Sequence, residues 1–231
     1  MKPTHAEIAD AMLSLRTGWL RTADIEFQNV VFSRSRWHWF DAAAAISHGG
    51  DTDGGMFGLA VGSVSILPSL GVPDAPIFHI AVAPFWYGSN PLLDAKPRTV
   101  TVIARSRCLV VQVPRYLLAE LLGADPARWR LIAESVTELL NLAQLVASDM
   151  QIRDSSRRAL AVLLRVAGCR AGGTTAATAE LSQDELAAMA NLSRQTTGPI
   201  LKELADVGLV TVGYRNIVLH DPAALRELVD L

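Results

Sequence analysis

The sequence predicts an α+β protein with three successive parts: an antiparallel β-sandwich or barrel, a long helix, and a small helical module that ends in a β-hairpin. Three patterns lead to this fold class. Short apolar runs alternate with glycine turns over residues 42–66, which is typical of sandwiches and barrels. A heptad pattern of apolar residues runs through 126–151. Two capped helices and a hairpin signal follow over 181–220.

The composition indicates a folded chain without a membrane span. Of its 231 residues, 50% are hydrophobic and 19% are charged, which is enough apolar material for a sizeable core. No apolar run approaches the roughly 18–20 residues of a membrane helix. Glu7 and Asp10 argue against a signal peptide. Cys108 and Cys169 lie far apart, so we expect buried thiols in a reducing compartment and a cytoplasmic protein.

The N-terminal part begins with a predicted amphipathic helix over Ile8–Leu20. The alternation Arg36-Trp37-His38-Trp39 predicts a strand whose aromatic rings lie in the core. Farther on, a turn at Gly88-Ser89-Asn90-Pro91 precedes a β-branched strand headed by Arg98. Backbone amides at such a turn, facing an arginine, can cradle an anion such as phosphate. The alternative is an ordinary turn beside a surface arginine.

The long helix is predicted from about Pro126 to Gln151, between a shorter helix over Pro114–Leu122 and another that begins at Arg157. Its apolar positions step by 4, 3, 4, 3 and 4 residues, as in a two-stranded coiled coil. We therefore expect self-dimerisation through this seam, with packing of the helix on its own domain as the alternative. The predicted dimerisation residues are Ile132, Val136, Leu139, Ala143, Val146 and Met150.

The C-terminal module begins after a small-residue loop over residues 171–178. Ser182 and Glu185 form a capping box, and Ser193 caps a second helix. Gly208 ends that helix in a left-handed position, and a hairpin turns at residues 213–216. This order describes a winged helix-turn-helix, whose second helix enters a DNA major groove.

The charge balance limits how this module can bind DNA. The chain has a net charge of −2. From Glu180 onward there are four basic residues against eight acidic ones, a balance of four minus eight. Non-specific affinity for DNA should therefore be weak, and binding should depend on few, well-placed contacts.

The order of these parts resembles the Crp/Fnr superfamily over nearly the whole chain. The resemblance is strongest in Gly50–Phe57, in Pro97–Val102 and in Leu181–Val212. It implies a double-stranded β-helix (jelly-roll) sensor domain over 1–125, a dimerisation helix over 126–152 and a winged helix-turn-helix over 153–231. Members are dimeric transcription regulators whose sensor domain re-aims two recognition helices.

Three departures from the family concern the effector. Cyclic-nucleotide binders have Gly-Glu-Leu where this chain has Gly88-Ser89-Asn90, so the carboxylate that bonds the ribose hydroxyl is absent. Cyclic AMP is therefore not the expected effector, although the resemblance still assigns an unidentified small effector to Gly88, Ser89, Asn90, Arg98 and Thr99. The N-terminal cysteine cluster of the iron-sulfur branch is missing, and His48 and His79 are expected to be structural or surface residues. No metal or cofactor is predicted.

The recognition helix has its own departure. The family pattern Ser-Arg-Glu/Gln-Thr-x-x-Arg corresponds to residues 193–199, where Pro199 replaces the last arginine. A proline inside a regular helix costs about 3 kcal/mol. Arg194 fits guanine and Gln195 fits adenine. The predicted DNA-binding residues are Ser182, Ser193, Arg194, Gln195, Thr196, Thr197, Lys202 and Arg215.

The leading hypothesis is a homodimeric, non-enzymatic transcription regulator that binds palindromic double-stranded DNA under the control of a small effector, with RNA polymerase as a further partner. One alternative is a degenerate member that acts through protein contacts or binds DNA without an effector. A metal-dependent jelly-roll enzyme is disfavoured because the five histidines are scattered and no His-x-His occurs.

Overall fold

The computed structural model describes all residues except 1, 54, 70–75, 95, 174 and 231. The chain forms two compact units, Met1–Ala75 with Ala81–Leu142, and Pro76–Ile80 with Ala143–Leu231. The division cuts the long helix α5 (Trp129–Gln151) and also strand β5 (His79–Val82), of which His79 and Ile80 belong to the second unit. The three-part division at residues 125 and 152 remains a prediction.

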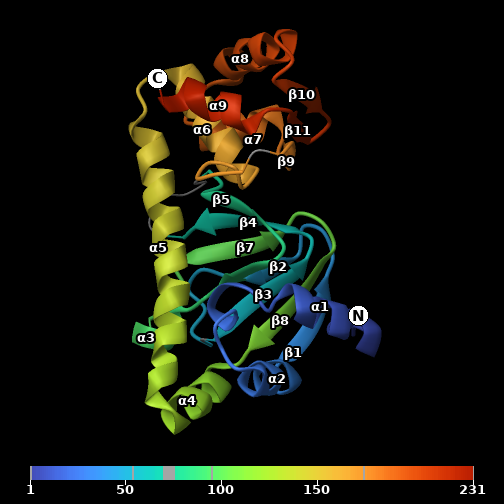
Figure 1. Cartoon of the computed structure of the whole chain (residues 1–231), viewed down its shortest axis with the longest axis vertical. Helices are drawn as coiled ribbons and strands as arrows, with labels where there is room; N and C mark the ends of the chain where they lie inside the picture. Colours follow the sequence, from blue (N-terminus) through green and yellow to red (C-terminus); the bar gives the residue numbers. More distant parts are fainter. Residues whose placement is uncertain (1, 54, 70–75, 95, 174, 231) are drawn as a thin grey trace. The chain divides into compact units, whose positions relative to one another are not determined.

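The first unit is built on two four-stranded sheets (Figure 1), ordered β1-β8-β3-β6 and β2-β7-β4-β5. Strand β3 pairs antiparallel with β6 and β8, and β7 pairs antiparallel with β2 and β4. Strands distant in sequence are thus neighbours, which confirms the predicted jelly-roll. The strands are β1 Arg36–Phe40, β2 Ala45–Ser47, β3 Met56–Val61, β4 Ser63–Pro68, β5 His79–Val82, β6 Phe85–Tyr87, β7 Val100–Ala104 and β8 Cys108–Val113.

Helices of the first unit depart from the prediction at the N-terminus. The expected helix over 8–20 is interrupted: α1 spans His5–Ser14, and a 3-10 turn, η1, covers Gly18–Leu20. Helix α1 ends at Ser14, and Gly18, which opens η1, has a φ of +55°, a left-handed conformation that rules out a continuous α-helix through this position. Helix α2 (Ile25–Ser33), capped by Asp24, was not predicted. Helix α3 (Asn90–Asp94) lies where a turn and loop were expected. Helices α4 (Arg115–Ala124) and α5 follow as predicted, joined by η2 (Pro126–Arg128).

An aromatic cluster occupies the core of the first unit. The ring of Trp19 packs edge-on against Phe27 and Trp86, with centroids 6.3 and 5.4 Å apart. The indole N–H of Trp86 donates to the carbonyl of Leu15. Trp37 is also buried here, as the strand pattern predicted, whereas Trp39 is only half-buried and packs against this cluster. These contacts hold the helices of the N-terminal segment against the sheet that contains β6.

The second unit consists of a helical core and a three-stranded sheet ordered β10-β11-β9. Leucines of α6 pack with those of α7, α8 and α9. Helix α9 was not predicted, and β9 takes in the end of the expected loop over 171–178. The elements are α6 Ser155–Val166, β9 Ala177–Ala179, α7 Gln183–Met189, α8 Arg194–Asp206, β10 Val210–Gly213, β11 Asn216–Leu219 and α9 Pro222–Asp230.

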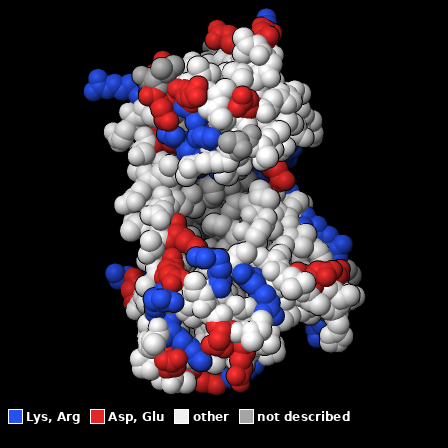
Figure 2. All heavy atoms as spheres, viewed as in Figure 1, with Lys and Arg blue, Asp and Glu red and all other residues white. Residues whose placement is uncertain are grey.

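Both cysteines are free and buried, as expected. Within the described part of the chain, no helix combines the length and the apolar character that crossing a membrane requires. Figure 2 shows one face of the molecule, on which basic and acidic side chains lie intermixed rather than in a continuous patch of either sign.

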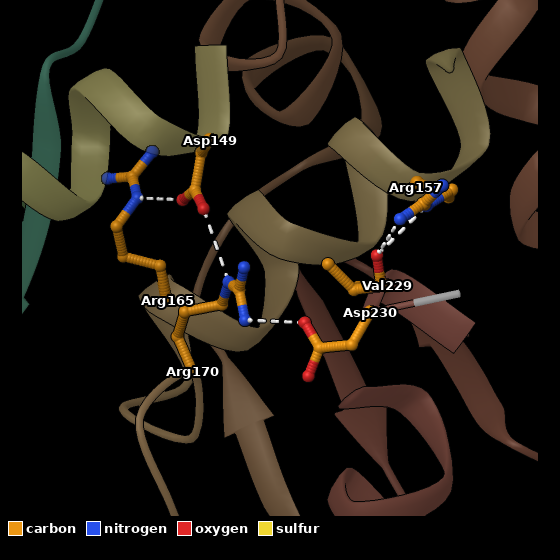
Figure 3. A network of polar contacts seen from close by, with 6 residues as sticks. All are labelled: Asp149, Arg157, Arg165, Arg170, Val229 and Asp230. Atoms are coloured by element: carbon orange, nitrogen blue, oxygen red, sulfur yellow. Dashed lines mark hydrogen bonds and ion pairs between the residues drawn. The ribbon is translucent and has the colours of Figure 1, made fainter. Parts of the chain in front are cut away.

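A buried ionic network ties helix α5 to helix α6 in the second unit (Figure 3). The carboxylate of Asp149 accepts from Nε of Arg165 at 2.8 Å and from Nε of Arg170 at 3.2 Å. The side chains of Asp149 and Arg165 are 0% and 1% exposed. Arg170 also reaches Asp230 at 3.6 Å. Because both members of the central pair are desolvated, loss of Asp149 would leave the guanidinium of Arg165 as an unpaired charge in the core.

His79 lies beside this network. Its Nδ1 is 3.4 Å from Nη1 of Arg165, which also donates to the carbonyl of Phe78 at 3.3 Å. Burial, together with the positive charge of Arg165, lowers the pKa of His79 from its ordinary value of 6.5 to about 3. The folded chain therefore keeps this imidazole neutral at pH values where the unfolded chain protonates it.

Acidification should therefore destabilise the protein through His79. The contribution is fully present above about pH 6.5 and is lost as the pH falls toward 3, because only the unfolded state then gains a proton. Between pH 6.5 and 4.5 the free energy of unfolding should fall by about 2–3 kcal/mol more in the wild type than in His79→Gln. Urea titrations at each pH measure this difference, with the exposed His48→Gln as control. Parallel pH profiles for the wild type and His79→Gln would contradict the prediction.

Candidate nucleic-acid interface and effector pocket

Two capped helices, α7 and α8, meet at a tight turn. The hydroxyl of Ser182 accepts from the backbone N–H of Glu185 at 3.2 Å, and the Glu185 carboxylate accepts from the N–H of Ser182 at 2.8 Å. Asn191 takes a left-handed φ of +51° between the helices. The hydroxyl of Ser193 then accepts from the N–H of Thr196 at 3.1 Å. Both predicted caps are confirmed.

A β-hairpin follows α8. Gly208, at φ +76°, ends the helix as predicted. Strands β10 and β11 pair antiparallel from Val210–Leu219 to Gly213–Asn216, and Arg215 takes a φ of +55° in the turn between them. Strand β11 also pairs with β9, which comes from before α7. The hairpin is thus anchored in a three-stranded sheet and presents the exposed Arg215 at its tip.

Helix α8 has a core face and a solvent face. Thr197, Ile200, Leu201 and Leu204 are buried. On the opposite side, exposed residues recur at helical spacing, and these are Gln195, Pro199, Lys202 and Asp206. Arg194 and Thr196 are exposed in the first turn. The end of α8 that follows the turn therefore carries the polar side chains that face solvent.

The predicted DNA-binding residues fall into two groups. Those with exposed side chains are Ser193, Arg194, Gln195, Thr196, Lys202 and Arg215. Ser182 is half-buried, and its hydroxyl is engaged in the capping box. The prediction for Thr197 is wrong: its side chain is fully buried, and its hydroxyl donates to the carbonyl of Ser193 at 3.0 Å. Thr197 shares the helix face of Ile200 and Leu204, which the core takes up.

Pro199 does not interrupt α8. The helix is continuous from Arg194 to Asp206 with the proline inside it. Pro199 has no N–H to donate to the carbonyl of Gln195, one turn earlier, so the helix forgoes one hydrogen bond there. The exposed side chain also offers no hydrogen bond to a ligand.

Acidic partners accompany the two exposed arginines of the module, which the sequence did not indicate. Nε of Arg194 lies 3.4 Å from the carboxylate of Asp184, and Nη2 of Arg215 lies 3.8 Å from that of Glu185. The side chains of Arg194 and Asp184 are 74% and 63% exposed, so the pair is weak and can open.

Most other arginines of the second unit bind backbone carbonyls or buried acids. Arg157 donates to the carbonyl of Val229, Arg158 to that of Ala190, and Arg226 to that of Cys169. With Arg165 and Arg170 in the ionic network, these cations stabilise the fold. Within the described part of this unit, the exposed basic side chains are Arg153, Arg194, Lys202 and Arg215. The electrostatic footprint for DNA is therefore small and lies largely on α8 and the hairpin.

The predicted effector residues do not form an open cradle. Asn90 and Thr99 are exposed, whereas Ser89 is fully buried and Arg98 is 6% exposed. The guanidinium of Arg98 is already surrounded by protein groups. Its Nε lies 3.4 Å from the carboxylate of Asp53, its Nη2 donates to the carbonyl of Gly55 at 3.1 Å, and it stacks over the ring of Phe57.

A cavity of about 80 Å³ lies among strands of this unit, and the five predicted effector residues are not in its lining. It is walled by aromatic, carboxylate and amide side chains, namely His38, Phe40, Ile46, Ser47, Asp51, Asp53, Phe57, Val110 and Gln112. Sites for small molecules and cofactors usually measure about 300–1,000 Å³. This cavity is too small for a nucleotide.

Comparison with known proteins gives the following likenesses. Residues 157–228 match the sequence model of a Crp-like helix-turn-helix domain. The chain is 32% identical over 139 residues to the HTH-type transcriptional regulator Cmr of Mycobacterium tuberculosis, covering 60% of this chain and 54% of the relative. It is 24% identical over 150 residues to the CRP-like cAMP-activated global transcriptional regulator of that organism, covering 61% and 64%. The aligned part thus spans less than two thirds of either relative.

Solved structures share the fold. FixK2 from Bradyrhizobium japonicum superposes with a TM-score of 0.70 at 18% identity, covering 84% of this chain and 96% of the other. The c-di-GMP responsive global regulator CLP from Xanthomonas campestris gives a TM-score of 0.66 at 20% identity, covering 85% and 99%. At these identities the likeness concerns the arrangement of the chain alone.

Proposed function

We propose that the chain is a Crp/Fnr-type transcriptional regulator that forms homodimers and binds palindromic DNA, because residues 157–228 match a Crp-like helix-turn-helix domain and a relative with 32% identity is a transcriptional regulator. The observation that carries the proposal is the first turn of α8. There Ser193 caps the helix, Arg194 and Gln195 face solvent, and the opposite face packs in the core. This is the arrangement by which a recognition helix presents its N-terminal residues to base edges.

Base recognition would rest on two side chains. Arg194 can donate two hydrogen bonds to O6 and N7 of guanine, and Gln195 can pair with N6 and N7 of adenine. Ser193, Thr196, Lys202 and Arg215 are exposed around them and suit phosphate oxygens. Pro199 lies one turn beyond Gln195 and adds no hydrogen bond, so specificity should depend on Arg194 and Gln195 more than in relatives that have the arginine.

The dimer seam needs a different register from the one the sequence suggested. Ile132 is 1% exposed and packs in the core of its own chain, and Met150 packs against the core of the second unit. A second apolar series on α5 steps by 4, 3, 4, 3 and 4 residues and is at least partly exposed at every position. It comprises Trp129, Ala133, Val136, Leu140, Ala143 and Ala147. We propose that this series faces the second copy, with Leu140, 53% exposed, at its centre.

Effector control divides the proposal into two versions. In one, a small effector binds the jelly-roll and re-aims the recognition helices. In the other, the chain binds DNA without an effector, and the engagement of Arg98 by Asp53 favours this version. Contact with RNA polymerase and a cytoplasmic location remain predictions.

A footprinting experiment tests the proposal. The purified chain should protect a palindrome in its own upstream DNA, with half-sites about 10–11 base pairs apart. Leu140→Asp should yield monomers in sedimentation and lose the paired footprint, whereas Asn141→Asp, at an exposed polar position of α5 outside the seam, should retain both. Binding of upstream DNA no tighter than of random DNA at low salt would refute the proposal.

A further inference from the structure

We propose that Asp53 acts as a tethered anion. Its carboxylate pairs with the guanidinium of Arg98 and lies where the phosphate group of an effector would bind. The inference concerns the effector control of the proposed function. It rests on that function only for the effect that ligand binding has on DNA binding. It makes Asp53 the residue that determines whether the jelly-roll accepts an anionic ligand.

The first step is that Arg98 offers no open face. Besides Asp53, Gly55 and Phe57, the backbone of Gly88 closes over the guanidinium: a Cβ added to Gly88 would lie 2.8 Å from Nη1. Gly88 also has a φ of +92°, so glycine is required there on two grounds. Among these groups, the carboxylate of Asp53 belongs to a half-exposed side chain and is the one that an anion from solution could replace.

The second step is that Asp53 is held in place. One carboxylate oxygen faces Arg98, and the other accepts from Nε2 of Gln112 at 3.2 Å. Backbone hydrogen bonds tie the preceding turn to the same arginine, from N of Arg98 to O of Asp51 at 2.9 Å and from N of Gly50 to O of Arg98 at 2.8 Å. The carboxylate is therefore held close to the guanidinium by its own chain, and an anion from solution competes with an intramolecular partner at high effective concentration.

The third step is that the carboxylate can be displaced and that an anion site would remain. The side chain of Asp53 is 50% exposed, whereas that of Arg98 is 3% exposed. The hydroxyl of Ser89 is buried and, among the residues that the structure describes, has no hydrogen-bond partner. A cation and an unsatisfied hydroxyl next to the same turn suit the oxygens of a phosphate group.

Inorganic phosphate is the probe for the test, with chloride at matched ionic strength as reference. The wild type should show no saturable binding in calorimetry up to millimolar phosphate. Asp53→Asn and Asp53→Ser should bind phosphate at least about tenfold more tightly, because the competing charge is gone. Asp10→Asn, at an exposed acid of α1, is the matched control and should behave as the wild type.

The groove of about 510 Å³ that contains Arg36 and Arg115 is also lined by Asp53 and Gln112, so an Asp53 variant could gain phosphate binding there instead. The double variant Asp53→Asn/Arg98→Gln must lose the gained binding, which assigns that binding to Arg98. Phosphate binding by the wild type that depends on Arg98 would overturn the inference, as would folded Asp53 variants that gain nothing. If the Asp53 variants gain phosphate binding but neither they nor the wild type binds DNA, the inference about Asp53 is retained and the proposed DNA-binding function fails.

Discussion

Replacement of Asp149 by alanine is expected to lower the free energy of unfolding by about 3–5 kcal/mol. The carboxylate is fully buried and accepts from Arg165 and Arg170, so its removal leaves the buried guanidinium of Arg165 without its counter-charge. Burial lowers the pKa of Arg165 and the Asp149 carboxylate opposes that shift, so the buried cation depends on this carboxylate. Urea unfolding at neutral pH measures the loss.

A double variant separates two effects on stability: the cost of leaving one buried charge unpaired, and the net contribution of the Asp149–Arg165 ion pair. Asp149→Leu with Arg165→Leu removes both central charges, and this double variant should be more stable than either single variant. Arg130→Ala breaks the exposed pair with Glu134 and should change the stability by less than about 1 kcal/mol. A loss below about 1 kcal/mol for Asp149→Ala would show that the pair does not stabilise the unit.

Replacement of Arg194 by alanine should weaken binding to the specific DNA site about tenfold to a hundredfold while changing binding to random DNA little. The reason is that a bidentate arginine–guanine contact is worth about 1–3 kcal/mol against the wrong base. Fluorescence anisotropy with the two DNA fragments over a range of salt measures both affinities. Arg34→Ala, in an exposed pair with Glu120 of the first unit, is the control.

The opposite effect is expected from Asp184→Asn. This change releases Arg194 from its exposed ionic partner and removes a negative charge next to the DNA, so affinity should rise by a few fold.

Equal affinity of the wild type and Arg194→Ala for the specific site would exclude Arg194 as a base-reading residue.

The sequence by itself determined the features that depend on near neighbours along the chain. The capping box at Ser182 and Glu185, the cap at Ser193 and the left-handed Gly208 are each satisfied within a few residues, so their residue types predict them. The same holds for the hairpin after α8 and for α5. Helix α2 was missed although its signals are local: Asp24 caps it, and Phe27, Val31 and Phe32 recur at helical spacing.

Only the tertiary structure decided what the functional side chains contact. Periodicity shows that α5 and α8 have an apolar face, but it cannot say that Ile132 belongs to the chain's own core or that Thr197 is buried. Spacing likewise could not bring Asp53 to Arg98, which lie 45 residues apart. The physical reason is that a hydrogen bond or an ion pair depends on distance in space. The fold therefore decided which arginines are free to meet DNA and which, like Arg165, are held inside.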